Sequence, residues 1–319
     1  MPATVAIRHC PSYDVAIIRR ELETALDALG GWQTVLHRGD RVLLKPNLLF
    51  ARPPEQAVTT HPAVVEAVGQ VARDCGTSLF LSDNPPYPNV FRNARKAGLA
   101  EVAQRVGIEI IELRHPTHTP RREPVHTREI STPPIAKTIL DFDVILNLPK
   151  VKAHQQMALT GGVKNLFGCV VGRRKAYWHF KLRPSREAFA AMLLGLYERI
   201  APELTIADGI VAMQGQGPGS GTPFPLHCVL VSPDALAMDC ILTEILRLPH
   251  SMQFLTQTAK NLGFPNADLE ACQCAGLTVS EATAPAFTLP TLTPIGFSLR
   301  HIIKGIFKNF LQSAKTEAH

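Results

Sequence analysis

The fold is decided by three neighbouring segments: RVLLKPN at residues 41–47, PAVVEAVGQVARD at residues 62–74 and SLFLS at residues 78–82. The first and third are short apolar runs, which predict strands over Arg41–Leu44 and Ser78–Ser82. The segment between them has a helical pattern of apolar residues and predicts a helix over Pro62–Asp74. A strand, a helix and a second strand in this order are typical of a parallel sheet with helices packed on it.

The same alternation continues on both sides of these segments. We therefore expect an α/β fold with a mainly parallel sheet and helices on both faces. The Pro- and Thr-rich stretch Pro116–Pro134 predicts a long surface excursion or a hairpin. Further strands are expected over Ile108–Leu113, Val144–Leu146, Leu204–Ala207 and His227–Val231, and further helices over Val15–Leu29, Ser185–Ile200 and Ala235–Leu246, the last with Asp234 as its N-cap.

The C-terminal part of the chain differs in composition from the rest. Residues 1–281 are expected to form the α/β domain, as one body or two lobes, and residues 282–294 form a Pro/Thr-rich linker. Residues 295–319 then predict a basic amphipathic helix, because apolar residues at helical spacing alternate with Arg, His and Lys. Two interpretations stay open: this helix docks on the domain, or it lies on an anionic membrane through residues 297–315.

Composition excludes several classes of protein. A hydrophobic fraction of 45% and a charged fraction of 19% in 319 residues are typical of a globular chain. Aromatic residues make up 6%, which argues against base stacking and hence against nucleic acid as a partner. We find neither a secretory signal nor an apolar run long enough to cross a bilayer. We therefore expect a cytoplasmic protein, with peripheral membrane contact as an added alternative.

The positive charge is concentrated in one segment. Between Lys150 and Arg186 there are nine basic residues and no Asp or Glu, whereas the whole chain carries +6, so the remainder carries −3. Such a segment attracts phosphate, carboxylate, nucleic acid or an anionic membrane, unless it is only a solvated basic face.

Polar residues follow several of the expected strands, at the edge where ligands bind in open parallel sheets. We expect this edge to form a cleft for an anionic substrate. In it, His154 or His179 would transfer a proton, and a carboxylate would orient the histidine or hold a metal ion. The alternatives are that the lysines are merely exposed to solvent and that the histidines have a structural role. The candidate cations and amides are Lys45, Asn47, Lys150 and Lys152, and the candidate carboxylates are Asp83 and Asp208.

Two glycine clusters add to this hypothesis. Gly161 and Gly162 precede Lys164 and Asn165, so backbone N–H groups and an ammonium group could approach one anion. A second cluster around Gly217 could wrap a ligand or form a mobile loop. Neither cluster has the spacing of a nucleotide-binding motif, and a tight turn is the alternative for the first.

The seven cysteines are an odd number without framework spacing, which predicts reduced thiols. Cys272-Gln273-Cys274 is the only close pair, and there is no C-x-x-C motif. An iron–sulfur cluster held by this chain alone is therefore not expected, since such clusters normally need four thiolates. The sequence leaves the cofactor and the metal open.

Taken together, these segments resemble a known family. Its signature blocks are matched by Lys45-Pro46-Asn47, Asn147-Leu148-Pro149-Lys150-x-Lys152-x-His154, Thr160-Gly161-x-x-Lys164-Asn165-x-x-Gly168, His179, Asp208-Gly209, Gly215-x-Gly217-Pro218 and Asp234-Ala235-x-Ala237-x-Asp239. In these blocks the chain resembles the domain-of-unknown-function 362 family. The resemblance implies an α/β fold and a site drawn from the blocks, but no known reaction. Many relatives carry ferredoxin-like iron–sulfur motifs, and this chain departs from that pattern.

Three functions follow from these observations. The first is an enzyme that acts on a phosphorylated or carboxylated small molecule in a cleft lined by Lys, His and Asp. The second is a binding protein peripheral to a membrane, and the third is a redox accessory protein related to the iron–sulfur members of the family. The substrate, the reaction and the oligomeric state stay open at this point.

Overall fold

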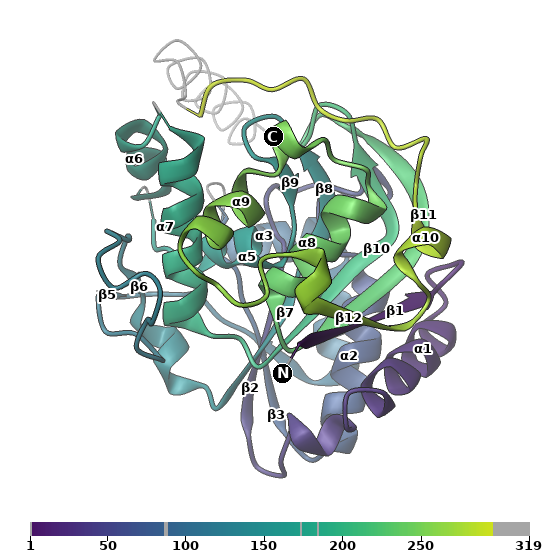
Figure 1. Ribbon diagram of the computed structural model, residues 1–319. Helices are drawn as coiled ribbons and strands as arrows, with labels where there is room; N and C mark the ends of the chain where they lie inside the picture. Colours follow the sequence, from purple (N-terminus) through teal and green to yellow (C-terminus); the bar gives the residue numbers. More distant parts are fainter. Residues whose placement is uncertain (1, 86–88, 173, 184, 296–319) are drawn as a thin grey trace, which may run out of the picture.

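The computed structural model describes residues 2–85, 89–172, 174–183 and 185–295, and Figure 1 shows its ribbon. Within these residues ten strands form one sheet in which the path β12-β1-β11-β10-β7-β2-β3-β4 is extended by β8 beside β10 and β9 beside β8. The strands of this sheet are β1 (Ala3–His9), β2 (Arg41–Pro46), β3 (Ser78–Leu81), β4 (Ile108–Ile110), β7 (Val144–Leu148), β8 (Lys150–His154), β9 (Ala158–Thr160), β10 (Leu204–Gln214), β11 (Thr222–Ser232) and β12 (Cys272–Gly276).

The predicted parallel sheet is confirmed. Along the path β10-β7-β2-β3-β4 each strand runs parallel to the next, and Leu44 of β2 lies opposite Leu146 of β7 and Leu81 of β3. Antiparallel pairing enters on the other side, where β11 joins β10 to β1. Strands β1, β8, β9 and β12 were not predicted. Strand β8 was missed because its sequence, KVKAH, is too polar to suggest a buried strand, although all five residues are buried.

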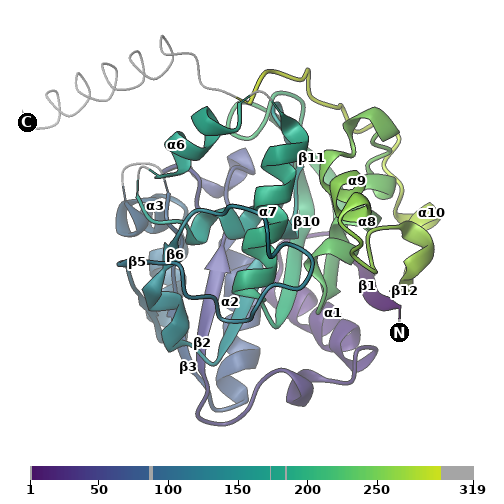
Figure 2. The same cartoon turned by 60° about the vertical axis from the view of Figure 1, so that its left-hand side comes forward.

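The helices cover both faces of this sheet, as predicted. They are α1 (Val15–Asp27), α2 (Pro62–Asp74), α3 (Val90–Lys96), α4 (Leu99–Val106), α5 (Gly162–Asn165), α6 (Arg174–Lys181), α7 (Arg186–Ile200), α8 (Ala235–Ile245), α9 (Phe254–Asn261) and α10 (Val279–Ala282). Helices α1 to α4 pack on one face. Helices α5 to α9 pack on the other, where Figure 1 shows α8 and α9 in front of the strands and Figure 2 shows α7 from the side.

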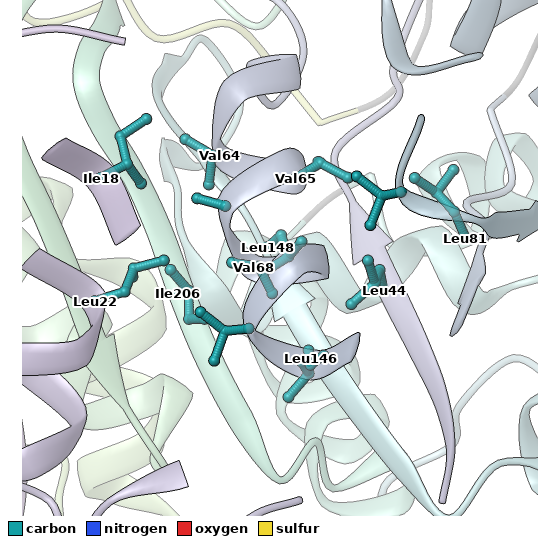
Figure 3. Packing of buried hydrophobic residues seen from close by; sticks show 14 of the residues in the cluster. Ile18, Leu22, Leu44, Val64, Val65, Val68, Leu81, Leu146, Leu148 and Ile206 are labelled. Carbon is teal, nitrogen blue, oxygen red and sulfur yellow. The ribbon is translucent and has the colours of Figure 1, made fainter. Parts of the chain in front are cut away.

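Side-chain alternation along each strand builds the two layers of core. Leu44 and Leu146 point to the first face, where Val64 and Val68 of α2 pack on them, as Figure 3 shows. Their neighbours Leu43 and Ile145 point to the second face and contact the core beneath α7. Because both faces are buried, the central strands are almost continuously apolar, which is typical of parallel sheets.

Two of the predicted helix starts are confirmed in detail. Asp234 caps α8, since its carboxylate accepts hydrogen bonds from the backbone N–H groups of Leu236 and Ala237 at 2.8 and 3.0 Å. The Ser185 hydroxyl accepts from the Ala188 N–H at 3.0 Å and caps α7. Such side chains satisfy N–H groups that have no partner inside the helix.

The Pro/Thr-rich stretch Pro116–Pro134 forms a long excursion from the sheet. Its ends pair as short antiparallel strands, β5 (Pro116–Thr117) and β6 (Ile135–Ala136). In between, the Glu198 carboxylate of α7 accepts hydrogen bonds from the backbone N–H groups of His126 and Thr127. The excursion is therefore fastened to α7 rather than free in solvent.

The segment predicted as a linker lies against the domain as far as it is described. The Ala284 N–H donates to the Ile245 carbonyl and the Thr293 N–H to the Gln155 carbonyl, both at 2.8 Å. The side chains of Phe287 and Ile295 are buried. The amphipathic helix predicted over residues 295–319 falls outside the described residues, apart from Ile295. Among the described helices, none is long and apolar enough to cross a membrane.

Candidate functional site

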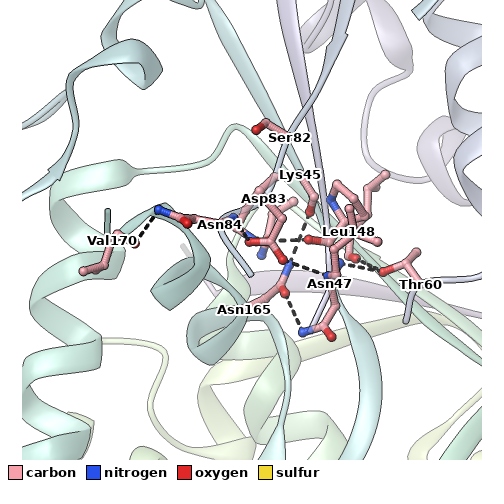
Figure 4. A network of polar contacts seen from close by, with 12 residues as sticks. Lys45, Asn47, Thr60, Ser82, Asp83, Asn84, Leu148, Asn165 and Val170 are labelled. Carbon is pink, nitrogen blue, oxygen red and sulfur yellow. Dashed lines mark hydrogen bonds and ion pairs between the residues drawn. The ribbon is translucent and has the colours of Figure 1, made fainter. Parts of the chain in front are cut away.

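The candidate site lies where β2, β3 and β7 end, and Figure 4 shows its polar contacts. At its centre is a buried ion pair: Lys45 Nζ lies 3.0 Å from Asp83 Oδ1, with side-chain exposures of 0% and 7%. Asp83 also accepts hydrogen bonds from the backbone N–H groups of Leu48 and Asn84, both at 2.8 Å. Burial raises the pKa of Asp83, but Lys45 and Lys175 outweigh it, so that the pKa is lowered. Asp83 is therefore a carboxylate at neutral pH.

Three asparagine side chains lie next to this pair, where Asn165 Nδ2 donates to the Lys45 carbonyl at 3.3 Å. Asn165 of α5 accepts from Asn47 Nδ2 and donates to Asn147 Oδ1, both at 2.9 Å. Asn147 Nδ2 in turn donates to the Gly162 carbonyl at 2.9 Å. The amide chain of Asn47, Asn165 and Asn147 thus joins β2, α5 and β7. Asn147 was not among the predicted site residues, although it belongs to one of the quoted motifs.

A cluster of lysines surrounds the Lys45–Asp83 pair, and we call Lys45, Lys152, Lys164 and Lys175 the lysine cluster. Lys152 is fully buried and donates to Asn47 Oδ1 and to the Val58 carbonyl, both at 2.7 Å. Within the described residues, Asp83 is the one carboxylate that forms an ion pair with the cluster. The ammonium groups therefore exceed the carboxylates that face them.

Burial and mutual repulsion lower the pKa values of these lysines. Burial, followed by the charge of Lys164, takes the pKa of Lys152 well below its ordinary range. Burial lowers the pKa of Lys164 to about 8, with Lys175 as the next cause. For Lys175 burial again comes first and gives a pKa of about 8, although Asp83 acts in the opposite direction. An uncompensated cationic centre of this kind gains free energy from an anion.

Lys175 was not predicted as a site residue. It lies on the short helix α6, and its ammonium group donates to the Asn84 carbonyl beside Asp83. No local pattern distinguishes it from Arg174, which is exposed on the same helix. Only the packing of α6 over the ends of the strands places it in the cluster.

The two predicted histidines approach the cluster at Lys164. His154 ends β8, and its Nδ1 accepts from the backbone N–H groups of Gln156 and Met157 at 3.1 and 3.3 Å. Its proton must therefore lie on Nε2 in the neutral ring. Burial and then Lys164 lower the pKa of His154 well below its ordinary value. The same two causes lower the pKa of His179 to about 3. Both rings are neutral at pH 7.

Lys150 and Asp208 belong to a second network. Their side chains form a buried ion pair at 2.9 Å. The Tyr13 hydroxyl donates to Asp208 at 3.0 Å and accepts from Lys150 at 2.7 Å and from the Val211 N–H at 3.1 Å. The hydroxyl thereby uses its one donor and both lone pairs. Asp208 also accepts from the His61 N–H at 2.9 Å, so this network fastens the start of α2 to β10.

The backbone N–H groups after Gly161 already bind a carboxyl group that belongs to the chain itself. Asp239 of α8 accepts from the N–H groups of Gly162 and Val163 at 2.6 and 3.0 Å. Burial raises the pKa of Asp239 to about 7, against the lowering effect of these bonds. A side chain at Gly161 would collide with this carboxyl group. The glycine pair therefore joins α5 to α8.

Gly217 belongs neither to the Lys150–Asp208 network nor to the contacts of Asp239. Its carbonyl accepts from the Gln155 N–H at 3.1 Å, and the peptide bond to Pro218 is cis. A side chain at Gly217 would collide with the Ala153 carbonyl of β8. The second glycine cluster thus packs against the end of β8, next to His154.

Only part of the site lines a surface pocket. One pocket is mostly apolar and includes Lys164 and Asp239 in its wall, together with Met157, Leu193 and Phe254. Lys45 and Asp83 are not part of its wall and are buried rather than exposed in an open cleft. In the part of the chain that the structure describes, no three His, Cys, Asp or Glu side chains are placed to hold a metal ion.

A mainly parallel α/β sheet with these motifs at its strand ends defines a class of proteins. The family model described as "Domain of unknown function (DUF362)" matches residues 42–244, and the chain belongs to this family. It is also similar to a thylakoid-associated protein of Synechocystis sp., with 35% identity over 320 residues that cover 97% of this chain and 95% of the relative.

A solved structure, the lactate racemase apoprotein from Thermoanaerobacterium thermosaccharolyticum, matches with a TM-score of 0.44 and 11% identity. The match covers 72% of this chain and 54% of that one, so the chain spans about half the length of the racemase. A likeness of this degree supports no argument about function.

Replacing Asp208 with Asn tests the second network. The buried Lys150 would lose its counter-charge while the shape of the site is kept, so we expect the free energy of unfolding to fall by about 3–5 kcal/mol. Urea denaturation measures it. The matched control is Asp268→Asn, whose ion pair with Lys260 has the same 2.9 Å distance but is exposed. Equal losses in the two variants would contradict this role.

Proposed function

We propose that the chain binds a phosphorylated or carboxylated small molecule at the lysine cluster and acts on it as an enzyme. The observation that carries this proposal is Lys152, a fully buried amino group whose two hydrogen-bond acceptors are uncharged oxygens. Burial and the charges of Lys164 and Lys150 disfavour its protonated form, and Asp83 only partly offsets them. Burial of a charge in such surroundings is costly, and a bound anion would offset the cost.

The arrangement of the other groups suits stabilisation of negative charge. Lys164 and Lys175, with pKa values near 8, are largely protonated at pH 7 and would approach anionic oxygens of the ligand. His154 is neutral with Nδ1 fixed by two backbone donors, so its Nε2–H is a hydrogen-bond donor rather than a base. Fixed donors and cations aimed at developing negative charge usually give the largest catalytic effect. The reaction therefore forms or moves negative charge on the bound molecule.

Replacing Lys164 with Met tests the anion site. We expect phosphate or malonate to raise the melting temperature of the wild-type chain, because both would bind the folded state only. The variant should bind at least about ten-fold more weakly, since a charged hydrogen bond contributes about 1.5–3 kcal/mol. Differential scanning fluorimetry and calorimetric titration measure the two effects.

The control is Lys137→Met, which removes an exposed lysine. Wild-type behaviour is expected of it. A rise in melting temperature with phosphate alone would indicate a phosphorylated substrate, and a rise with malonate alone would indicate a carboxylated one. No increase with either anion in the wild-type chain would refute the site.

The pH dependence gives an independent test. The pKa values of Lys164 and Lys175 are lowered from 10.5 to about 8, so the folded chain releases these protons before the unfolded chain does. Between about pH 8 and pH 10.5 these two groups therefore make the anion-free protein more stable as the pH rises. Affinity for phosphate should fall over the same range. Lys164→Met should lose part of both effects, and a pH-independent affinity would contradict the assignment.

The name of the Synechocystis relative favours a second function, peripheral attachment to a membrane. On α6, the side chains of Tyr177 and Phe180 are 60% and 47% exposed, and Arg174 and Lys181 are exposed beside them. Aromatic rings among cations are typical of helices that lie at a membrane interface. The predicted C-terminal amphipathic helix would add a second point of contact.

Vesicle binding tests this function. We expect the full chain to sediment with vesicles of phosphatidylglycerol but not of phosphatidylcholine, and to be released by high salt, because the contact is partly electrostatic. Tyr177→Ser with Phe180→Ser should weaken binding several-fold, and a chain ending at residue 295 should weaken it further. The matched control is Phe91→Ser, at a residue 45% exposed on α3. Binding that is indifferent to lipid charge would count against the proposal.

A further inference from the structure

Two thiols from distant parts of the sequence meet beside α8. Cys240 of α8 and Cys272, the first residue of β12, both approach the Asn266 carbonyl, with Sγ–O distances of 3.5 and 3.9 Å. The two thiols thus converge on one carbonyl oxygen, and each shifts the pKa of the other. The Cys272 thiol lies 3.3 Å from the Asp268 carbonyl, which holds it at the beginning of β12. This pair takes no part in the lysine cluster.

The environments of the two thiols differ in a way that matters for reactivity. The neighbouring Cys240 thiol lowers the pKa of Cys272, which is only partly buried. The neighbouring Cys272 thiol, together with burial, raises the pKa of Cys240, whose side chain is 3% exposed. The thiolate is the nucleophilic form, so Cys272 attacks first and Cys240 is held next to the product.

We propose that Cys240 and Cys272 form a reversible disulfide when hydrogen peroxide reaches them. The Cys272 thiolate attacks one peroxide oxygen, the O–O bond breaks and hydroxide leaves, which gives a sulfenic acid. Cys240 then loses its proton and attacks the sulfenic sulfur; the S–S bond forms and the sulfenic oxygen leaves as water. In sum, two thiols and one peroxide give one disulfide and two waters. A dithiol reductant reverses the step by exchange.

The surroundings favour a small neutral oxidant. Cys240 lines a pocket with Glu244, Asp268 and Glu270, and the one lysine of its wall, Lys260, is paired with Asp268. The pocket wall is therefore acidic, and its field repels an anionic oxidant such as glutathione disulfide. Hydrogen peroxide carries no charge and is not repelled.

The neighbour in the sequence is not a suitable partner. Cys272 and Cys274 lie two residues apart in an extended strand, so their side chains point the same way with Cβ atoms about 6–7 Å apart. A disulfide needs Cβ atoms about 3.5–4.5 Å apart. The tertiary fold, by contrast, brings the Cys240 and Cys272 thiols to the same backbone oxygen, that of Asn266.

Thiol counting with peptide mapping tests the proposal on the full reduced chain. We expect mild peroxide to remove two of the seven thiols, and a non-reduced digest to contain the peptides of Cys240 and Cys272 joined by a disulfide. Dithiothreitol should restore all seven. Before oxidation, Cys272 should react fastest with iodoacetamide at pH 7.

The matched control is Cys274→Ser, which should still lose two thiols. Cys272→Ser should keep Cys240 reduced, and its melting curve shows whether it is folded. Three results would each overturn the proposal: Cys240 still open to alkylation after peroxide, Cys272 joined to Cys274, or a disulfide between two chains. None of these outcomes depends on whether the lysine cluster binds an anion.

Discussion

Burial of lysine ammonium groups at the ends of the parallel strands is the constraint on which the site depends. Removing an ammonium group from water costs several kcal/mol unless a counter-charge or hydrogen bonds replace the solvent. Lys45 and Lys150 meet this condition through Asp83 and Asp208. Lys152 meets it only in part, through two uncharged oxygens. The carboxyl edge of the sheet therefore has an ion pair at β10, whereas Lys152, between β2 and β8, hydrogen-bonds only to uncharged oxygens among the described residues.

This difference separates the roles of residues that look alike in the sequence. Around Asp208 every group is matched, since the Tyr13 hydroxyl, Lys150 and the His61 N–H all bind one carboxylate. An ion pair of this kind, with a shared hydroxyl, supports the fold. Burial lowers the pKa of Lys150 as well as those of Lys152 and Lys164, but only around the last two does positive charge exceed negative charge. A site for an anion needs positive charge that the chain's own carboxylates do not neutralise, which is why we propose that the substrate binds at the lysine cluster.

The sequence predicted the architecture well because strand and helix periods are local properties. The segments around Leu44 and Leu81 showed the parallel pairs, and Asp234 showed the start of α8. Strand β8 was missed because its lysines are buried by tertiary contacts that no local pattern reveals. The same reason explains Lys175, which reaches the site only because α6 folds over it. The sequence placed Lys150 and Lys152 together, whereas the fold gives them different partners.

Helix α8 connects the two parts of the molecule on which the proposals rest. Asp239 holds the N–H groups that begin α5, the helix that carries Lys164 and Asn165. The next residue, Cys240, approaches the Asn266 carbonyl, as Cys272 does, and the Asn266 amide donates to the Asp234 cap of the same helix at 2.7 Å. Because packed interiors transmit displacements, a covalent bond at Cys240 acts one residue away from the carboxyl group that positions α5. The thiol pair therefore lies on the same helix as this carboxyl group, one residue from the contact that positions the helix carrying Lys164.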